Sequence, residues 1–183
     1  MGHGGNIIEE LTADHRRAEA MFDVITGLPA RSAQRRKAAD EFTVELVRHS
    51  VAEERDLYPA VREHVQDGDE LADLEIVDHT VLEQHLKTLE MLDADHADFD
   101  RLVETILIDV TAHFRDEEDR LFPLLAAACT PEQLNGLGDK VRAARKQAPA
   151  GPWSSDATSP NRFLAPGPGL VDRARNYFTG RGW

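Results

Sequence analysis

The sequence is poor in cysteine, in aromatic residues and in positive charge. Its single cysteine, Cys129, excludes an internal disulfide and is typical of a reducing compartment. Lys and Arg together number 21 against 34 Asp and Glu, so the formal net charge is -13 at pH 7. This negative excess argues against nucleic acid and anionic membrane surfaces as partners, because both require a basic face on the protein.

Long apolar runs are also missing. No stretch approaches the roughly 20 apolar residues that a helix needs to cross a bilayer. The chain opens on small and polar residues, which do not form a signal peptide. We therefore expect a cytoplasmic protein without a membrane span. Its 183 residues fit one domain with a substantial core.

What the sequence does contain is one repeated pattern, a histidine followed four residues later by a glutamate. The pattern occurs at His15/Glu19, His49/Glu53, His79/Glu83 and His113/Glu117. Residues four apart lie on one face of a helix, so each pair can present an imidazole and a carboxylate to the same point. Because roughly 0.7 such pairs are expected by chance at this composition, the repetition indicates metal binding.

The spacing of these histidines predicts how the helices are arranged. Successive histidines are 34, 30 and 34 residues apart, which is about one helix plus a turn in an up-down bundle. Antiparallel helices of equal reach bring pairs on either side of a turn to the same height. All four pairs can therefore meet at one level of a bundle.

Apolar periodicity and helix-ending residues place the individual helices. The first three are expected over about 6–25, from about 32 to a kink or end at Pro59, and over about 70–92. The third is assigned from Leu71, Leu74, Val77, Val81, Leu82 and Leu89. The fourth helix spans about 97–128 and bends at Pro123. A fifth helix begins at a capping box formed by Thr130 and Gln133 and ends near 146. The sequence thus predicts an all-α fold, an antiparallel up-down four-helix bundle with a short fifth helix and a flexible C-terminal tail.

The composition changes near residue 148, where Pro, Gly, Ser and Ala become frequent. We therefore expect the bundle and fifth helix over 1–147, and a linker with a short amphipathic tail over 148–183. The tail has an apolar side formed by Leu170, Val171, Ala174, Tyr177 and Phe178. Docking on the bundle, binding of a protein partner and free disorder all remain open for this tail.

The donor types indicate the chemistry of the site. Imidazole and carboxylate suit zinc, iron or manganese, and the lack of cysteine ligands disfavours structural zinc. Four histidines and up to four glutamates are too many for one tetrahedral zinc, and they fit two iron ions that share bridging carboxylates. Ferritin-like di-iron proteins use Glu-x-x-His, so the histidine-first order here disfavours that interpretation.

A weak internal repeat links the second and fourth helices. Segment 49–59 matches segment 113–123 position for position, as His-x3-Glu-Glu-x2-Leu-aromatic-Pro. The aromatic residue is Tyr58 in the first copy and Phe122 in the second. Because its counterpart is a phenylalanine, Tyr58 is interpreted as a packing residue rather than a redox residue or ligand.

A leading histidine, a first copy of this repeat, a histidine on the third helix and a second copy together resemble the hemerythrin-like (HHE cation-binding) domain family. The resemblance covers about residues 6–128. It implies a non-haem site ligated by His15, His49, Glu53, His79, His113 and Glu117, with both glutamates bridging. It also implies two iron ions, with an oxo or hydroxo bridge, that bind dioxygen, nitric oxide or peroxide.

Glu83 departs from the pattern of the oxygen-carrying hemerythrins, which have a second histidine at this position of the third helix. Some hemerythrin-like proteins carry glutamate there, so Glu83 is expected to be a further ligand. A carboxylate donates more negative charge and favours Fe(III), whereas reversible oxygen carriage needs stable Fe(II). We therefore expect the protein to autoxidise rather than to store oxygen.

Two other glutamates remain open. Glu19 lies outside the family's ligand set and is an eighth ligand, an acceptor that orients His15, or a solvent-facing residue. Glu118 is an alternative to Glu117, because oxygen carriers use a carboxylate five residues after that histidine. The remaining histidines lack the spacing and are interpreted as surface residues: His3, His64, His85 and His96.

Three functions are compatible with these patterns. The leading hypothesis is a di-iron protein that binds small oxidants or nitric oxide as a carrier, sensor or scavenger. The second is an enzyme that consumes peroxide or nitric oxide at the same site. The third is a structural or partner-binding bundle in which the metal is a staple.

Overall fold

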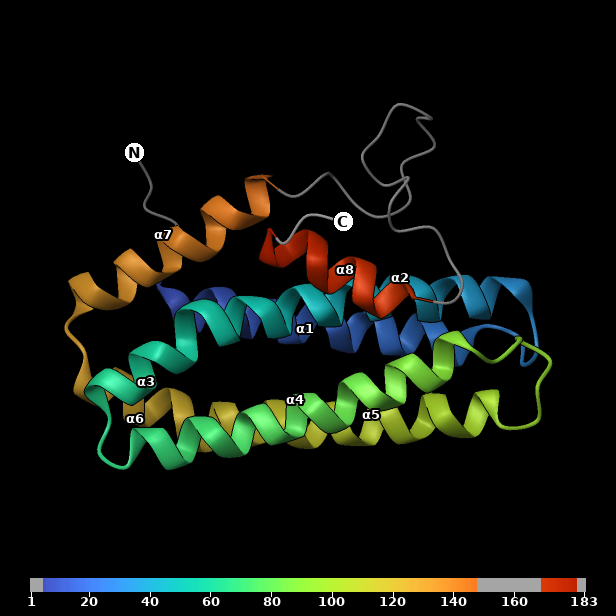
Figure 1. The fold of residues 1–183 in the computed structure, drawn as a ribbon, viewed down its shortest axis with the longest axis horizontal. Helices are drawn as coiled ribbons and strands as arrows, with labels where there is room; N and C mark the ends of the chain where they lie inside the picture. The colour runs from blue at the N-terminus through green and yellow to red at the C-terminus, as the bar shows by residue number, and fades with distance from the viewer. Residues whose placement is uncertain (1–4, 148–168, 181–183) are drawn as a thin grey trace.

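The computed structural model describes residues 5–147 and 169–180, and every regular element in these ranges is helical. Long helical rods run side by side along the long axis of the molecule, and further helices lie against them (Figure 1). The rods are α1 (Ile7–Gly27); α2 (Ala33–Ala52), η1 (Glu53–Leu57) and α3 (Tyr58–His64); α4 (Gly68–Glu90); and α5 (Phe99–Asp116), η2 (Glu117–Leu121) and α6 (Phe122–Ala128). The predicted all-α four-helix bundle is confirmed.

Local capping explains where the first rod and the fifth helix begin. Asn6 and Glu9 form a reciprocal capping box at α1, with the Glu9 amide donating to Asn6 Oδ1 at 3.1 Å. The fifth helix is α7 (Pro131–Gln147), where the predicted box forms between Thr130 and Gln133. Pro131 occupies the first helical position, where the missing N–H costs nothing.

Each copy of the internal repeat contains a π-helical turn that begins at its glutamate. The Tyr58 amide donates to the Glu53 carbonyl, and the Phe122 amide donates to the Glu117 carbonyl. A proline follows each turn, and a proline ring within a regular helix would clash with the carbonyl four residues earlier. The wider π turn accommodates Pro59, so the second rod continues into α3 instead of ending.

The core consists of two apolar clusters with a polar layer between them. One cluster includes Phe22, Phe42, Leu86, Phe99 and Ile106, and the other includes Leu11, Leu57, Val61, Leu121 and Leu125. Every rod passes from one cluster to the other through a layer of buried histidines and glutamates. These polar residues are His15, His49, Glu53, His79, His113 and Glu117.

The buried face of α4 does not follow the apolar residues from which this helix is predicted. Three of them, Leu74, Val77 and Val81, are 54%, 58% and 42% exposed. The buried face instead carries Ala72, Glu75, His79, Leu82, Leu86 and Leu89. The predicted helix forms, but two polar residues, Glu75 and His79, occupy its inward face at the level of the polar layer.

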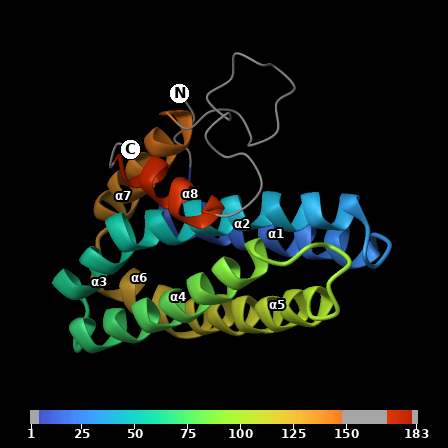
Figure 2. The same cartoon turned by 45° about the vertical axis from the view of Figure 1, so that its right-hand side comes forward.

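Two helices beyond the four rods cover one side of the bundle. α7 packs along α1, and α8 (Leu170–Thr179) packs on α2 and α4. Figure 2 shows α8 against α2 in a second orientation. Leu170, Val171 and Ala174 are completely buried, so the amphipathic segment of the tail docks on the bundle. The predicted linker over 148–168 lies outside the described residues, and the domain boundary at 147/148 stays a prediction.

Candidate metal centre

The polar layer brings together six of the seven predicted ligands, and these come from all four rods. Around them, described histidines and glutamates form three overlapping groups whose ligand atoms lie within 4.8 Å of one another. The groups are His15, His49, Glu53 and Glu117; Glu53, His79 and His113; and Glu75, His113 and Glu117.

Glu53 lies between two sets of histidines. Its Oε1 atom is 2.9 Å from His49 Nε2 and 3.9 Å from His15 Nε2. Its Oε2 atom is 3.3 Å from His79 Nε2. One carboxylate therefore presents a different oxygen to each side of the layer, which is the placement that a bridging ligand requires.

Glu117 connects the same two sides from the opposite rod. Its Oε2 atom is 3.3 Å from His15 Nε2 and 3.8 Å from His113 Nε2. His113 Nε2 in turn lies 3.2 Å from His79 Nε2. The four imidazoles thus all direct Nε2 toward the two central carboxylates.

The hydrogen bonding of this layer is incomplete. Within residues 5–147 and 169–180, no hydrogen-bond partner is found for His15 Nε2, His49 Nε2, both carboxylate oxygens of Glu53 and Glu117 Oε2. Buried polar atoms are almost always paired in native proteins, because an unpaired one costs about 1–3 kcal/mol. Convergent, unpaired nitrogen and oxygen atoms are the donor set of a metal centre.

Comparisons with known proteins agree with this geometry. The family model of the hemerythrin HHE cation-binding domain matches residues 6–125. The chain belongs to the hemerythrin HHE cation-binding domain family. The predicted resemblance is thereby confirmed, and the matched range contains all four rods up to α6.

Two individual relatives extend the comparison. An uncharacterized hemerythrin-like protein of Schizosaccharomyces pombe is 22% identical over 157 residues, which cover 85% of this chain and 75% of the relative. The crystal structure of a hemerythrin HHE cation-binding domain-containing protein from Mycobacterium kansasii is 23% identical, with a TM-score of 0.70. The match covers 79% of this chain and 87% of that one, and at this identity it shows the fold alone.

Around the hemerythrin centre, each histidine has a carboxylate on its outer side. His15 Nδ1 donates to Glu118 at 2.7 Å, and His79 Nδ1 donates to Glu54 at 3.2 Å. The other two outer pairs are His113 Nδ1 with Glu75 at 3.2 Å, and His49 Nδ1 with Asp14 at 3.8 Å. A carboxylate only accepts hydrogen bonds when ionised, so these partners favour hydrogen on Nδ1 and leave Nε2 for the interior.

Each outer carboxylate is in turn paired with an arginine. The pairs are Arg16 with Glu118, Arg120 with Glu75, Arg145 with Asp14, and Arg175 with Glu54. Two of the arginines belong to the rods, whereas the other two come from α7 and α8. The candidate metal centre is therefore surrounded by a charged outer layer to which both C-terminal helices contribute.

The structure does not bring Glu83 to the centre, although its spacing from His79 matches the other pairs. Its carboxylate lies 2.7 Å from Arg175 Nε and 3.0 Å from Lys87 Nζ. Glu19 likewise points outward and pairs with Arg16 at 2.9 Å. In both cases a nearby cation holds the carboxylate on the outer surface of its helix.

Two residues beside the centre were not identified from the sequence. Glu75 is buried on α4, four residues before His79, but it belongs to no His-x3-Glu pair. Tyr58 does pack in the apolar core as expected, yet its hydroxyl also donates to Glu117 Oε1 at 3.2 Å. The same hydroxyl is 3.0 Å from His79 Nε2. The sequence signal for Glu75 is its spacing, since a residue four positions before His79 lies on the same face of the helix.

Aromatic rings close the centre on the side of the first rod. The Phe114 ring stacks on His15 with ring centroids 3.9 Å apart and an interplanar angle of 10°. The Phe122 ring is nearly parallel to His15 at 5.7 Å. These rings fix the His15 plane and separate it from water.

Metal-free protein holds protons where the metal would bind. Burial lowers the pKa of His15, but hydrogen bonds to Glu117 and Glu53 outweigh burial and raise it to about 9. Burial is likewise outweighed at His49 and His79 by the nearby carboxylates, which raise their pKa values to about 9 and about 10. These imidazoles are therefore charged at neutral pH and neutralise the central carboxylates.

The raised pKa values predict how the stability of metal-free protein depends on pH. Charged His15, His49 and His79 stabilise the fold fully below their ordinary pKa of 6.5, and this contribution disappears as pH rises through about 9–10. The melting temperature of metal-free protein should fall between pH 6.5 and pH 10. Thermal unfolding followed by circular dichroism measures this. Metal-loaded protein is the control, because bound imidazole is already neutral; equal pH profiles would contradict the interpretation.

Proposed function

We propose that this hemerythrin domain holds two iron ions and binds dioxygen, nitric oxide or peroxide at them. The observation that carries the proposal is the placement of Glu53, whose two oxygens face different histidines. Glu117 approaches histidines of both sides as well. One side has His15 and His49, and the other has His79 and His113, so each metal would receive two imidazoles and share two carboxylates.

The residues fit two iron ions better than a single structural zinc. Thiolate ligands are not among the described donors, and imidazole with bridging carboxylate is a typical iron environment. A single zinc takes four ligands, which would leave other buried donors in this layer unpaired. Two metal ions would satisfy the unpaired Nε2 atoms of His15 and His49 and the unpaired carboxylate oxygens of Glu53 and Glu117.

The surroundings favour a small ligand over an organic substrate. Apolar clusters lie on both sides of the polar layer, and the Phe114 ring stacks directly on His15. A surface cavity of about 650 Å³ between α4 and α8 reaches His79, which is itself only 3% exposed. Bound iron would supply redox-active coordination positions, and the burial of His79, Glu53 and Glu117 favours diatomic ligands or peroxide at them.

The outer carboxylates supply a reason for autoxidation that does not depend on Glu83. A carboxylate on Nδ1 makes an imidazole a more basic ligand at Nε2. Glu54, Glu75 and Glu118 are 2.7–3.2 Å from the Nδ1 atoms of three of the histidines. More basic ligands favour Fe(III) over Fe(II), so we still propose a domain that reacts with oxygen rather than one that stores it.

A second candidate function, peroxide disproportionation, is favoured by Tyr58. Its hydroxyl contacts both Glu117 and His79 inside the layer, so it can hold or pass a proton at the centre. Converting two hydrogen peroxide molecules into two waters and one dioxygen requires such proton movement. The equivalent residue in the other repeat, Phe122, has no hydroxyl, so this proton carrier is on one side alone.

The metal-staple hypothesis remains the outcome if the loaded protein fails to react with small ligands.

The finding on membranes is narrower than the expectation from the sequence: within the described ranges, none of the helices is long and apolar enough to cross a bilayer. We propose a cytoplasmic location because Cys129 is buried and unpaired, as expected in a reducing compartment.

Metal stoichiometry tests the two-iron proposal. Iron-loaded wild-type protein should contain two irons per chain, because both sides of the layer provide a complete ligand set. Glu53→Gln and Glu117→Gln should each lose at least one iron, since an amide is a poor bridging ligand. Elemental analysis and the near-ultraviolet absorption spectrum measure this. Glu19→Gln is the matched control and should retain both irons; one zinc or no metal in wild-type protein would refute the proposal.

Oxygen reactivity tests the carrier against the reactive alternatives. Ferrous-loaded protein should oxidise on mixing with air and show no reversible absorption change when air and argon are alternated. Glu75→Gln should slow oxidation by roughly tenfold if its carboxylate makes His113 a more basic ligand. Stopped-flow absorption measures both rates, with Glu19→Gln as the control. Repeated reversible oxygenation would show an oxygen carrier instead.

Tyrosine replacement tests the enzymatic candidate. Tyr58→Phe should keep both irons but release dioxygen from peroxide at least about tenfold more slowly, because a positioned acid or base contributes about 100-fold or more. An oxygen electrode measures the rate. Tyr177→Phe on α8 is the matched control and should match wild type. Equal rates in all three proteins would remove the support for a role of Tyr58 in turnover.

A further inference from the structure

The C-terminal helix α8 is attached to the metal-binding rods by polar as well as apolar contacts. Its first amide groups donate to Glu90 of α4, from Gly169 at 2.7 Å and from Val171 at 3.0 Å. Asp172 pairs with Lys87 of α4 at 2.8 Å. α8 lies outside the range matched by the family, residues 6–125, yet it forms part of the wall beside the centre.

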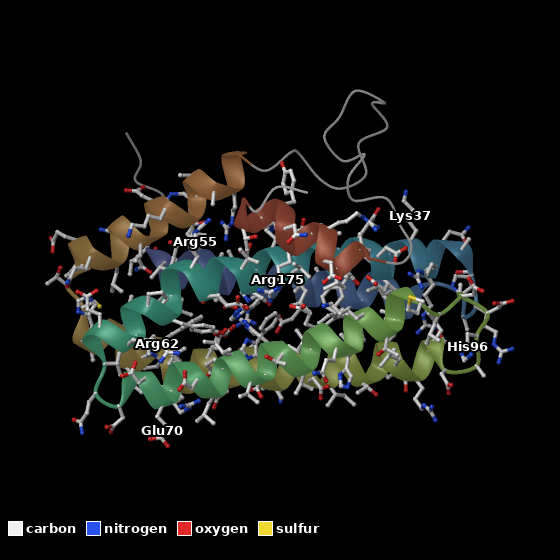
Figure 3. The ribbon with its side chains drawn as sticks, viewed as in Figure 1. Lys37, Arg55, Arg62, Glu70, His96 and Arg175 are labelled. Atoms are coloured by element: carbon white, nitrogen blue, oxygen red, sulfur yellow. The ribbon has the colours of Figure 1, made fainter. Side chains whose placement is uncertain are left out.

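Arg175 is the residue of α8 that is directed toward the metal centre. Figure 3 shows it midway along the bundle, between α8 and α4. Its Nη1 and Nη2 atoms donate to the two carboxylate oxygens of Glu54 at 2.8 and 3.1 Å. Its Nε atom lies 2.7 Å from Glu83 Oε2. One guanidinium therefore connects η1 with α4, the helix that carries His79.

The contact with Glu54 continues to the centre. Glu54 Oε1 accepts the hydrogen bond from His79 Nδ1 at 3.2 Å, and His79 Nε2 is directed to Glu53 Oε2 at 3.3 Å. A bidentate arginine fixes the plane of a carboxylate as well as its position. Arg175 thus restricts the orientation of Glu54, which in turn restricts the orientation of His79.

The contact with Glu83 has a separate consequence. Glu83 is four residues after His79, the spacing at which Glu53 and Glu117 follow their own histidines. Arg175 and Lys87 hold its carboxylate on the side of α8 instead. The same arginine that supports one residue of the centre keeps a competing carboxylate away from it.

We propose that Arg175 is a positioning residue of the metal centre, which holds Glu54 on His79 and withholds Glu83 from the ligand set. The C-terminal helix thereby determines the ligands on the His79 side. This proposal rests on the proposed function in one respect, that His79 binds metal. Its geometric part, the orientation of His79 by Arg175 through Glu54, does not require metal.

Metal release to a chelator tests the proposal. Arg175→Ala and Glu54→Gln should each accelerate release of iron by roughly tenfold, as is usual for the partners of metal-bound histidine. In a Glu83→Gln background, where no freed carboxylate can bind the metal, both changes act through the same contact, so the double variant should release iron about as fast as Glu54→Gln alone. Arg175→Lys should be intermediate, since an ammonium cannot bind Glu54 in the same bidentate manner.

Asp172→Asn is the matched control. It removes the contact of α8 with Lys87 but leaves Arg175 on Glu54 and both Arg175 and Lys87 on Glu83, so it should release iron within about twofold of the wild-type rate. Release from Arg175→Ala at the wild-type rate, or effects of Arg175→Ala and Glu54→Gln that multiply, would overturn the proposal. An equal acceleration by Asp172→Asn would overturn it too, because the effect would then reflect general loosening of α8.

A measurement on metal-free protein separates this proposal from the proposed function. In ¹⁵N spectra of the histidine rings, Arg175→Ala should shift the His79 signals and leave those of His15 unchanged, because His15 is held by Glu118 instead. If wild-type protein binds no iron while Arg175→Ala still shifts the His79 signals selectively, the di-iron function is refuted and the positioning role is retained. Unchanged His79 signals would refute the positioning role whatever the metal content.

Discussion

The burial of four imidazoles and two carboxylates in the middle of a helical bundle is the constraint on which the rest of this structure depends. Moving a charged group from water into a protein interior costs roughly several kcal/mol unless an opposite charge or a metal ion compensates it. In metal-free protein the histidines compensate Glu53 and Glu117 by remaining protonated, with pKa values of about 9–10 for His15, His49 and His79. The two proposed metal ions would replace these protons, which would couple metal binding to folding at this layer.

Charge compensation alone does not fix the orientation of the imidazole rings. The carboxylates and arginines around the histidines fix it. Each histidine faces a carboxylate through Nδ1, and each of these carboxylates faces an arginine. A planar guanidinium group holds a carboxylate in a defined orientation, and the carboxylate in turn restricts the plane of the imidazole that it contacts. Arg145 of α7 and Arg175 of α8 are two of these arginines, so helices outside the matched family range complete the support of the centre.

The sequence predicted the four rods well, because helical periodicity and the regular spacing of the histidines are local signals. It could not distinguish Glu53 and Glu117, which face the centre, from Glu19 and Glu83, which do not, since all four share one spacing. That difference depends on cations that hold the last two outward, and Arg175 is far from Glu83 in the sequence. Tyr58 was only partly understood for the same reason: its partner Glu117 is 59 residues away.

The internal repeat gives the centre an approximate symmetry that two features break. Both repeats have a π turn after the inner glutamate, so Glu53 and Glu117 enter the layer in equivalent ways from opposite rods. Tyr58 places a hydroxyl beside His79, whereas its counterpart Phe122 places an apolar ring beside His15. The cavity between α4 and α8 also reaches the His79 side. The cavity, the Tyr58 hydroxyl and the Arg175 contact from α8 therefore all lie on the His79 side, so the two proposed metal positions would be chemically unequal despite their similar ligands.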